Sequence, residues 1–142
     1  MTIRQARTED AGDICRINKS ALGYEYPENQ TRLQLEKILG MDSDRIFIAE
    51  IDGETAGYVH AGRYECTYNG GLKNILALAV EERFRGRGAG RLLMRAAEEW
   101  AASESCIGVR LVSGLNRTGA HAFYLRCGYS LRKEQKNFIK LF

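Results

Sequence analysis

Val80-Glu81-Glu82-Arg83-Phe84-Arg85-Gly86-Arg87-Gly88-Ala89-Gly90-Arg91-Leu92-Leu93 joins an apolar run that ends at Val80 to an amphipathic run that begins near Leu92. This order predicts a strand, a glycine-rich turn and the start of a helix. Glycine has no Cβ atom, so a ligand can approach the backbone of such a turn closely. The free N–H groups and the dipole of a helix start attract an anion. Arg85, Arg87 and Arg91 add forked donors, so the segment predicts a phosphate-binding site.

The spacing of the glycines separates the known kinds of phosphate loop. A P-loop needs Lys-Ser or Lys-Thr after its last glycine, and the segment has neither. The dinucleotide pattern G-x-G-x-x-G fails because Arg91 or Leu93 stands at its third glycine. The pattern that fits is R-x-x-G-x-G, formed by Arg85, Gly88 and Gly90. It resembles the acetyl-CoA pyrophosphate signature of the GCN5-related N-acetyltransferase (GNAT) family, and an ordinary strand-to-helix turn with solvated arginines is the alternative.

Composition indicates one globular domain, which we expect to cover residues 1–142. The chain is 44% hydrophobic and 27% charged, and its net charge of +3 argues against nucleic acid as the main partner. Its apolar runs are too short to span a membrane, and residues 1–7 lack the apolar core of a signal peptide. We therefore expect a cytoplasmic protein. The scattered cysteines predict free thiols and no metal site: Cys15, Cys66, Cys106 and Cys127.

Apolar periodicity and turn residues predict the order of the elements. Strands are expected at about 3–7, 45–51, 54–65, 75–80 and 108–112, and helices at about 8–22, 28–39, 92–101 and 117–127. A hairpin over about 130–142 would finish the chain. The order β-α-α-β-β-β-α-β-α-β-β implies an α/β fold with a mixed, mostly antiparallel central sheet flanked by about four helices. A parallel strand pair is expected around the long helix.

A second motif extends the resemblance over essentially the whole chain. Residues 117–129 look like the family's N-x-x-A-x-x-h-Y-x-x-x-G-[FY], where h is apolar. The positions that match are Ala120, Phe123, Tyr124, Gly128 and Tyr129. The asparagine of the motif is replaced by Arg117, and Asn116 stands one residue earlier. The resemblance implies an acetyl-CoA-dependent N-acetyltransferase with a single-domain, GNAT-like fold.

The resemblance also implies how acetyl-CoA is held. The pantetheine arm would pair with the strand that ends at Val80, as an added strand does. The pyrophosphate would lie in the glycine-rich turn, and a backbone N–H near Ala79 or Val80 would polarise the thioester carbonyl. The candidate cofactor-binding residues are Leu78, Ala79, Val80, Arg85, Gly86, Arg87, Gly88, Ala89, Gly90, Arg91, Asn116, Arg117 and Phe123.

The implied reaction is a direct attack of a primary amine on the thioester. Tyr124 stands at the position of the family's general acid, and a phenol of pKa about 10 can protonate the leaving thiolate. A core aromatic is the alternative for this residue. Many relatives carry a glutamate on the strand over 74–80, but this chain has no acid there. Glu65, the catalytic candidate, and His60 lie on the neighbouring strand; each could instead be a surface or substrate-binding group.

The substrate side is expected to combine aromatic and acidic residues, which suit a cationic amine. The candidate substrate-binding residues are Tyr24, Glu25, Tyr26, His60 and Tyr64. An ordinary wet loop is the alternative for the first three. A small molecule and a protein amine are both compatible, as are a monomer and a homodimer. The alternative function is a non-catalytic acyl-CoA-binding module, which the missing strand glutamate favours and Tyr124 disfavours.

Overall fold

The computed structural model describes residues 1–142, which form two compact units. The first unit, Met1–Leu111, contains all five strands, and the second, Val112–Phe142, contains one helix. None of the helices combines the length and apolar character that a membrane span needs. The single domain expected over residues 1–142 stays a prediction.

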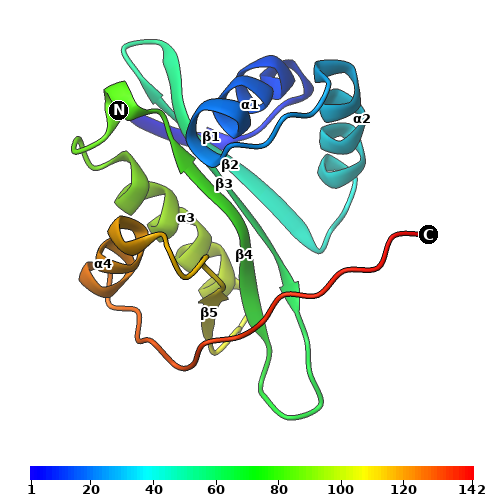
Figure 1. Ribbon diagram of the computed structural model, residues 1–142, viewed down its shortest axis with the longest axis vertical. Helices are drawn as coiled ribbons and strands as arrows, with labels where there is room; N and C mark the ends of the chain where they lie inside the picture. Colours follow the sequence, from blue (N-terminus) through cyan, green and yellow to red (C-terminus); the bar gives the residue numbers. More distant parts are fainter. The chain divides into compact units, whose positions relative to one another are not determined.

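One five-stranded sheet forms the centre of the first unit (Figure 1). The strands from β1 to β4 are antiparallel neighbours, whereas β4 and β5 are parallel. A parallel pair needs a crossover connection, and helix α3 (Ala89–Ser103) supplies it. The mixed, mostly antiparallel sheet expected from the sequence is therefore confirmed. Its spatial order is β1 (Thr2–Gln5), β2 (Asp44–Ile51), β3 (Glu54–Tyr64), β4 (Leu72–Val80) and β5 (Gly108–Leu111).

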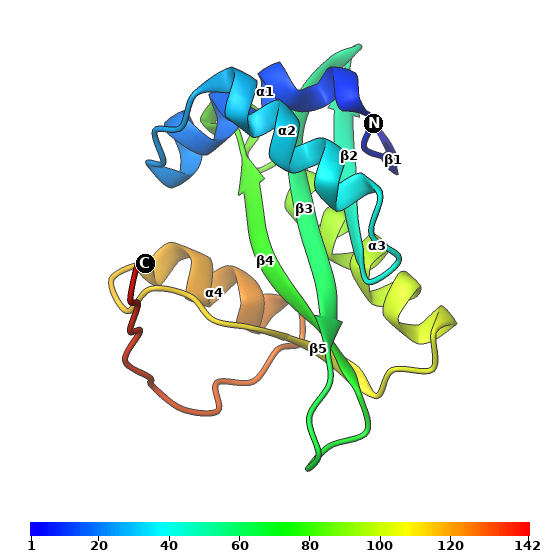
Figure 2. The same ribbon diagram turned by 90° about the vertical axis from the view of Figure 1, so that its right-hand side faces the viewer.

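Helices cover both faces of this sheet (Figure 2). Helices α1 (Ala11–Ile17) and α2 (Glu28–Leu39) lie on one face, and α3 lies on the other. A 3-10 turn, Thr8–Asp10, precedes α1, and a π-helical stretch, Asn18–Leu22, follows it. Helix α3 buries an apolar stripe with the spacing of one helix face. The buried residues of α3 are Ala89, Leu93, Met94, Ala97, Trp100 and Ala101.

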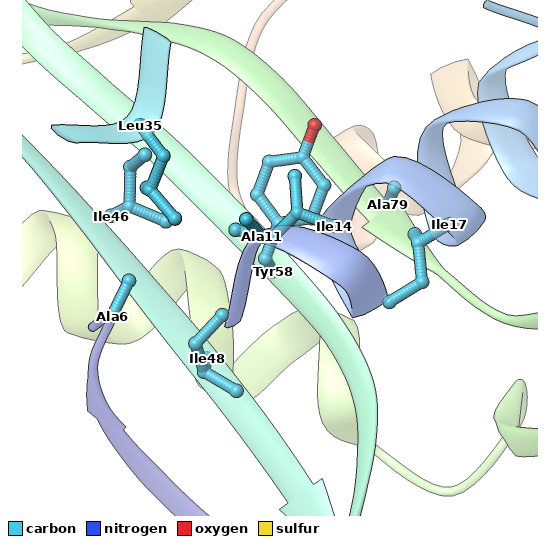
Figure 3. Packing of buried hydrophobic residues seen from close by; sticks show 9 residues of the cluster. All are labelled: Ala6, Ala11, Ile14, Ile17, Leu35, Ile46, Ile48, Tyr58 and Ala79. Carbon is cyan, nitrogen blue, oxygen red and sulfur yellow. The ribbon is translucent and has the colours of Figure 1, made fainter. Parts of the chain in front are cut away.

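The core beneath α1 and α2 consists of small and branched side chains that interdigitate with the sheet (Figure 3). Ile17 of α1 and Ile48 of β2 are fully buried, and Tyr58 of β3 is nearly so. Burial of each large apolar side chain stabilises the fold by about 1.5–3 kcal/mol relative to its exposure. Leu33 of α2 is apolar but 63% exposed. The buried polar residue Thr31 takes an inner position and donates its hydroxyl to the Pro27 carbonyl.

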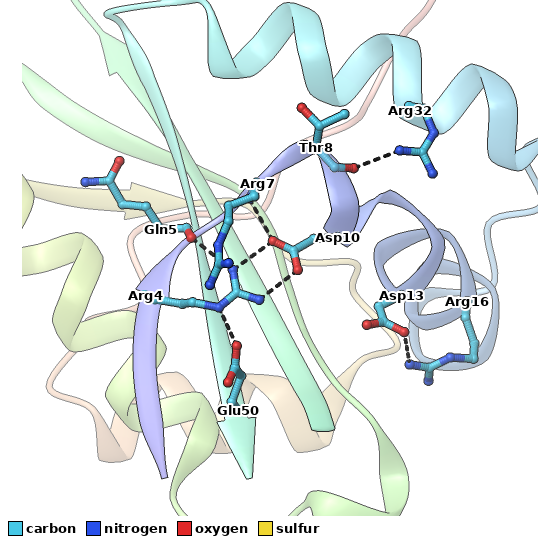
Figure 4. A network of polar contacts seen from close by, with 9 residues as sticks. All are labelled: Arg4, Gln5, Arg7, Thr8, Asp10, Asp13, Arg16, Arg32 and Glu50. Carbon is cyan, nitrogen blue, oxygen red and sulfur yellow. Dashed lines mark hydrogen bonds and ion pairs between the residues drawn. The ribbon is translucent and has the colours of Figure 1, made fainter. Parts of the chain in front are cut away.

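An ion-paired arginine ties the start of α1 to the sheet (Figure 4). Arg4 Nη1 and Nη2 donate to Asp10 Oδ2 and Oδ1, each at 2.8 Å, and Arg4 Nε pairs with Glu50. The Arg7 N–H also donates to Asp10 Oδ2, at 2.7 Å. Burial favours the neutral form of Asp10, but these hydrogen bonds outweigh it and hold the pKa of Asp10 below its ordinary value. The bidentate pair therefore joins β1, β2 and the entry of α1.

A buried, ion-paired lysine ties the sheet to helix α3 on the other face. Lys73 of β4 is 2% exposed, and its Nζ donates to Glu104 Oε1 at 2.5 Å. The same ammonium lies 3.9 Å from the centroid of the Trp100 ring, while Trp100 Nε1–H donates to Glu104 Oε2 at 3.1 Å. A buried charge requires such partners. The three residues link β4 to the C-terminal end of α3.

The second unit contains α4 (Thr118–Arg126), which ends before Gly128 at a φ of +92°. The expected hairpin over 130–142 is wrong, because no strand follows α4. The segment contains no Asn-Gly or similar two-residue turn. Its apolar side chains are exposed, so burial does not stabilise paired strands there: Leu131, Phe138, Ile139, Leu141 and Phe142.

We predict that Glu104→Gln lowers the free energy of unfolding by roughly 1–2 kcal/mol at neutral pH, because it removes the charge paired with buried Lys73. The Lys73 hydrogen bond lowers the pKa of Glu104, so the stabilisation is complete above the ordinary value of 4.5. It is lost as the pH falls through the lower value of the folded state. Urea unfolding curves of parent and variant should therefore converge in acid.

Glu99→Gln is the matched control for this prediction. Glu99 lies on the same helix in an exposed pair with Arg95, at 3.6 Å. Its replacement should change the free energy of unfolding by less than about 0.5 kcal/mol. Equal losses in the two variants, or no loss in Glu104→Gln, would contradict the structural role of the Lys73 pair.

Candidate active site

The turn between β4 and α3 has the backbone shape that the sequence predicts for anion binding. Gly86 and Gly88 have φ values of +77° and +90°, a left-handed conformation that glycine adopts without strain. Gly88 is also the N-cap residue of α3. A Cβ built on either glycine would meet no atom within 4 Å, so the space above the turn is open. The first N–H groups of α3 and the positive end of its dipole face this region.

The arginines of the turn differ in how they are held. Arg85 Nε donates to the Val80 carbonyl at 3.1 Å, which places this exposed side chain across the end of β4. Arg87 lies 3.7 Å from Asp52, a distance that leaves a weak, exposed ion pair. Glu81 is buried and binds Arg83 Nε at 2.9 Å, and it also pairs with Arg16 of α1. The turn therefore begins with a carboxylate that two arginines hold, and further arginines follow it along the chain.

One edge of β4 carries no partner strand over its last residues. Strand β5 pairs with β4 only from Leu72 to Ile75, and no strand continues the ladder on that edge to Val80. Backbone groups on an unpaired edge can bind an extended ligand as an added strand. Leu78, Ala79 and Val80 lie in this part of β4, directly before the glycine-rich turn.

A buried tyrosine of β3 lies opposite the same part of β4, along the edge that β4 shares with β3. Tyr58 lies opposite Ala79 in the register, and its hydroxyl bonds to Asn18 Oδ1 of the π-helical stretch. Burial raises the pKa of Tyr58 to about 12, so the phenol keeps its proton and can donate to Asn18. Sequence reasoning missed this pair, because nothing in the sequence indicates that Asn18 lies above β3.

The second unit holds the remaining motif residues. Arg117 occupies the N-cap position of α4 and Asn116 precedes it, while Phe123 and Tyr124 lie on the helix itself. The Tyr124 ring packs edge-to-face with Phe123 at 5.3 Å and with Tyr129 at 6.0 Å between centroids. Burial raises the pKa of Tyr124, an effect that the positive charge of Arg117 only partly offsets. Tyr124 is therefore a protonated, half-buried phenol.

The loop between the π-helical stretch and α2 forms a shallow hollow of about 450 Å³. Tyr24, Glu25 and Tyr26 line it, as the sequence suggested for a substrate surface, and both tyrosines are exposed. Two cations share the hollow. Lys19 Nζ lies 3.7 Å from Glu25 Oε1, and Arg16 contributes to the wall. The charge of the hollow is thus mixed rather than acidic.

The candidate residues on or next to β3 lie at different distances from the end of β4. Gly57 lies opposite Val80, whereas Glu65 follows the end of β3, eight residues away, or ~26 Å along the strand. Glu65 is exposed, and its place as a catalytic residue stays a prediction. His60 lies opposite Ala77, near the unpaired part of β4. Tyr64 stacks under the Arg110 guanidinium at 4.3 Å.

Three polar residues of this region were not expected from the sequence. Asp44 bonds to His60, and Arg110 Nη1 donates to Asn74 Oδ1 at 2.6 Å. They lie on three different strands, so only the strand register brings Asp44 next to His60 and Arg110 next to Tyr64 and Asn74. The single usable signal was the presence of polar residues on otherwise apolar strands.

Comparison with known proteins identifies the family. The sequence model of the Acetyltransferase (GNAT) family matches residues 11–129. An uncharacterized N-acetyltransferase of Methanocaldococcus jannaschii is 26% identical over 150 residues; the match covers 99% of this chain and 65% of that protein, slightly less than two thirds of its length. An uncharacterized N-acetyltransferase of Chlorobaculum tepidum is 33% identical over 127 residues, covering 89% of this chain and 74% of that protein.

A solved structure supports the same fold. The aminoglycoside N-acetyltransferase AAC(6')-Iy, in complex with a bisubstrate analogue that contains CoA, matches with a TM-score of 0.86 and 20% identity. The match covers 99% of this chain and 98% of that one. The chain therefore belongs to the acetyltransferase (GNAT) family, a family of N-acetyltransferases that use acetyl-CoA.

Proposed function

We propose that the protein transfers the acetyl group of acetyl-CoA directly to a primary amine. The observation that supports this most is the β4–α3 turn. It combines Gly86 and Gly88 in left-handed conformations, open space above them and the start of a 15-residue helix. The unpaired edge of β4 leads into this turn and suits the pantetheine arm. Pyrophosphate and pantetheine would thus be bound by neighbouring backbone segments.

The proposed reaction forms one bond and breaks one. The amine nitrogen attacks the thioester carbon, and the C–S bond breaks with its electron pair on sulfur. An ammonium substrate gives up two protons in total: one goes to a base, and the other replaces the proton that an acid gives to the CoA thiolate. A backbone N–H near Ala79 or Val80 would stabilise the oxygen as negative charge develops.

We propose Tyr124 as the acid that protonates the thiolate. Its match to the second motif supports this role, and so does its protonation state, because burial raises its pKa. A phenol with a raised pKa stays neutral at physiological pH, so its proton is in place when the thiolate forms beside it. Asn116, Arg117 and Phe123 are proposed to contact the cofactor from the same motif.

The proposed acceptor is a small amine that contacts the hollow lined by Tyr24, Glu25 and Tyr26. AAC(6')-Iy binds an analogue in which CoA is joined to acetylneamine, so a matching fold accommodates an amine of that kind. Aromatic rings and a carboxylate both attract an ammonium. Because Lys19 and Arg16 share the hollow, we propose an acceptor that also carries a polar or anionic group.

Release of CoA thiol from acetyl-CoA across a panel of amines tests the function. We expect at least one small amine to accelerate release well above the rate without amine. A protein that binds acetyl-CoA but releases no thiol with any amine would instead be the non-catalytic binding module. The two functions are thus separated by one assay.

We predict that Gly88→Ala weakens acetyl-CoA binding at least roughly tenfold, as measured by calorimetry. The added methyl would occupy the open space above the turn, and alanine is strained at a φ of +90°. Gly23→Ala is the matched control, because Gly23 has a φ of +76° and equally open space. It should lose similar stability but keep the parental affinity. Equal affinities in all three proteins would exclude the turn as the pyrophosphate site.

We predict that Tyr124→Phe lowers kcat roughly 10²–10⁴-fold, because it keeps the ring but removes the proton. The affinity for CoA should change little. Tyr129→Phe is the control, since it removes the same atom from the neighbouring ring of the cluster, and its kcat should stay close to the parental value. Near-parental turnover in folded Tyr124→Phe, under conditions where chemistry limits the rate, would leave solvent as the proton donor.

A further inference from the structure

A partly buried histidine–aspartate pair lies on the face of the sheet that carries α1 and α2. His60 Nε2 lies 2.7 Å from Asp44 Oδ2, and the two side chains are 13% and 12% exposed. Ser43 Oγ donates to the other carboxylate oxygen, Oδ1, at 2.7 Å. Both oxygens of Asp44 are thus engaged, and the carboxylate is fixed in one orientation.

The hydrogen bond also defines which nitrogen of His60 can accept a proton. A carboxylate oxygen accepts hydrogen bonds and does not donate them, so Nε2 must carry the hydrogen. In the neutral imidazole Nδ1 then holds the lone pair. Nδ1 makes no hydrogen bond to the protein. The pair therefore offers one oriented, basic nitrogen.

The strand register places this nitrogen's ring near the proposed acetyl site. His60 lies opposite Ala77 of β4, and Tyr58 lies opposite Ala79. His60 and Tyr58 are two residues apart, or ~7 Å along β3. Directly opposed residues share one face of a sheet, so His60, Tyr58 and Ala79 face the same side. Gly62 leaves room for the Asp44 carboxylate, since a Cβ at this position would lie 2.8 Å from Asp44 Oδ2.

Asp44 is the charged residue that pairs with His60, and the other charged residues of the packed elements have different partners or are exposed. Strand β4 presents Ala77 opposite it, and the charged residue of that strand, Lys73, is held against Trp100 on the other face. The charged side chains of the helices on this face are paired or exposed. Asp13 binds Arg16, and the other charged residues of α1, the π-helical stretch and α2 are exposed: Arg16, Lys19, Glu28, Arg32, Glu36 and Lys37.

We infer that His60 is the general base of the acetyl transfer and that Asp44 is its positioning residue. This inference rests on the proposed function. The Nδ1 lone pair takes one proton from the substrate ammonium, and the freed nitrogen attacks the thioester carbon. Tyr124 gives its proton to the CoA thiolate, the second proton of the amine restores Tyr124, and the proton on His60 passes to water. The base therefore comes from β3, which explains why β4 needs no glutamate.

The first arm of the test examines the pair without any turnover. The chain has two histidines, so ¹⁵N NMR of the imidazoles shows two rings, and His121 serves as the internal reference. In the parent, neutral His60 should carry its hydrogen on Nε2. In Asp44→Asn the amide can donate to Nε2, so the hydrogen should move toward Nδ1. A neutral parent ring with its hydrogen on Nδ1 would overturn the assignment.

The second arm compares turnover of three variants at saturating acetyl-CoA with an amine found in the panel. His60→Gln should lower kcat roughly 10²–10⁴-fold at neutral pH, the usual size for a positioned base. The deficit should shrink as the pH approaches the amine's own pKa, because solution then supplies the free amine. Asp44→Asn should lower kcat at least roughly tenfold with little change in KM. Asp42→Asn makes the same change at an exposed neighbour and should keep the parental kcat.

The outcomes separate the inference from the function on which it rests. A parent that releases no thiol with any amine overturns the function and the base together. An active parent with an unimpaired, folded His60→Gln, or a deficit that does not shrink at high pH, overturns only the base. Acetyl-CoA affinity, measured by calorimetry, should be parental in all three variants, and a loss there would indicate a structural role instead.

Discussion

Helix α3 (Ala89–Ser103) must begin soon after β4 ends at Val80, and this constraint organises the rest of the first unit. The parallel pair β4–β5 requires a crossover, so the chain has to turn sharply after Val80 and start a helix. Only a residue without Cβ adopts the positive φ of Gly86 and Gly88 without strain. The turn that the topology demands is therefore also the turn that leaves helix N–H groups open to an anion. Lys73 and Glu104 hold the far end of the same helix against β4.

The short pairing of β5 completes this arrangement. Because β5 stops at Leu111, the edge of β4 from Leu76 to Val80 remains available for a ligand. The side of β4 that pairs with β3 is supported by Tyr58, whose hydroxyl is held by Asn18. A rigid, half-paired strand that leads into an anion-binding turn suits a long cofactor with a phosphate group. In the proposed binding mode, polar residues of β2 and β3 lie near the reactive end of such a cofactor.

Local sequence patterns were enough to predict most of the fold. The Asp52-Gly53 hairpin, the β4–turn–α3 unit and the parallel pair all follow from turn chemistry and periodicity, which act over a few residues. The expected hairpin after α4 was wrong, because apolar alternation alone cannot show whether a segment finds a partner strand. Leu33 fits the apolar period of α2 but is exposed, since Thr31 and Leu35 already fill the inner face.

The candidate site was predictable only where it is contiguous in sequence. The glycine-rich turn and the α4 motif each lie within one short segment. The Asp44–His60 pair joins residues 16 positions apart, and only the register of β2 and β3 makes them neighbours. Arg110 and Asn74 meet for the same reason, across 36 positions. Pairs of this kind depend on tertiary structure, so composition and spacing do not indicate them.

The proposed acetyl transfer depends on the binding of CoA to the backbone of the β4–α3 turn. The most direct measurement is a ¹H–¹⁵N NMR titration of the free protein with CoA. The largest shifts should fall on the amides of Gly86, Gly88, Ala89 and Gly90, and pantetheine, which lacks the pyrophosphate, should leave these amides unshifted. Saturable binding with the largest shifts elsewhere, and with unshifted turn amides, would contradict this binding mode.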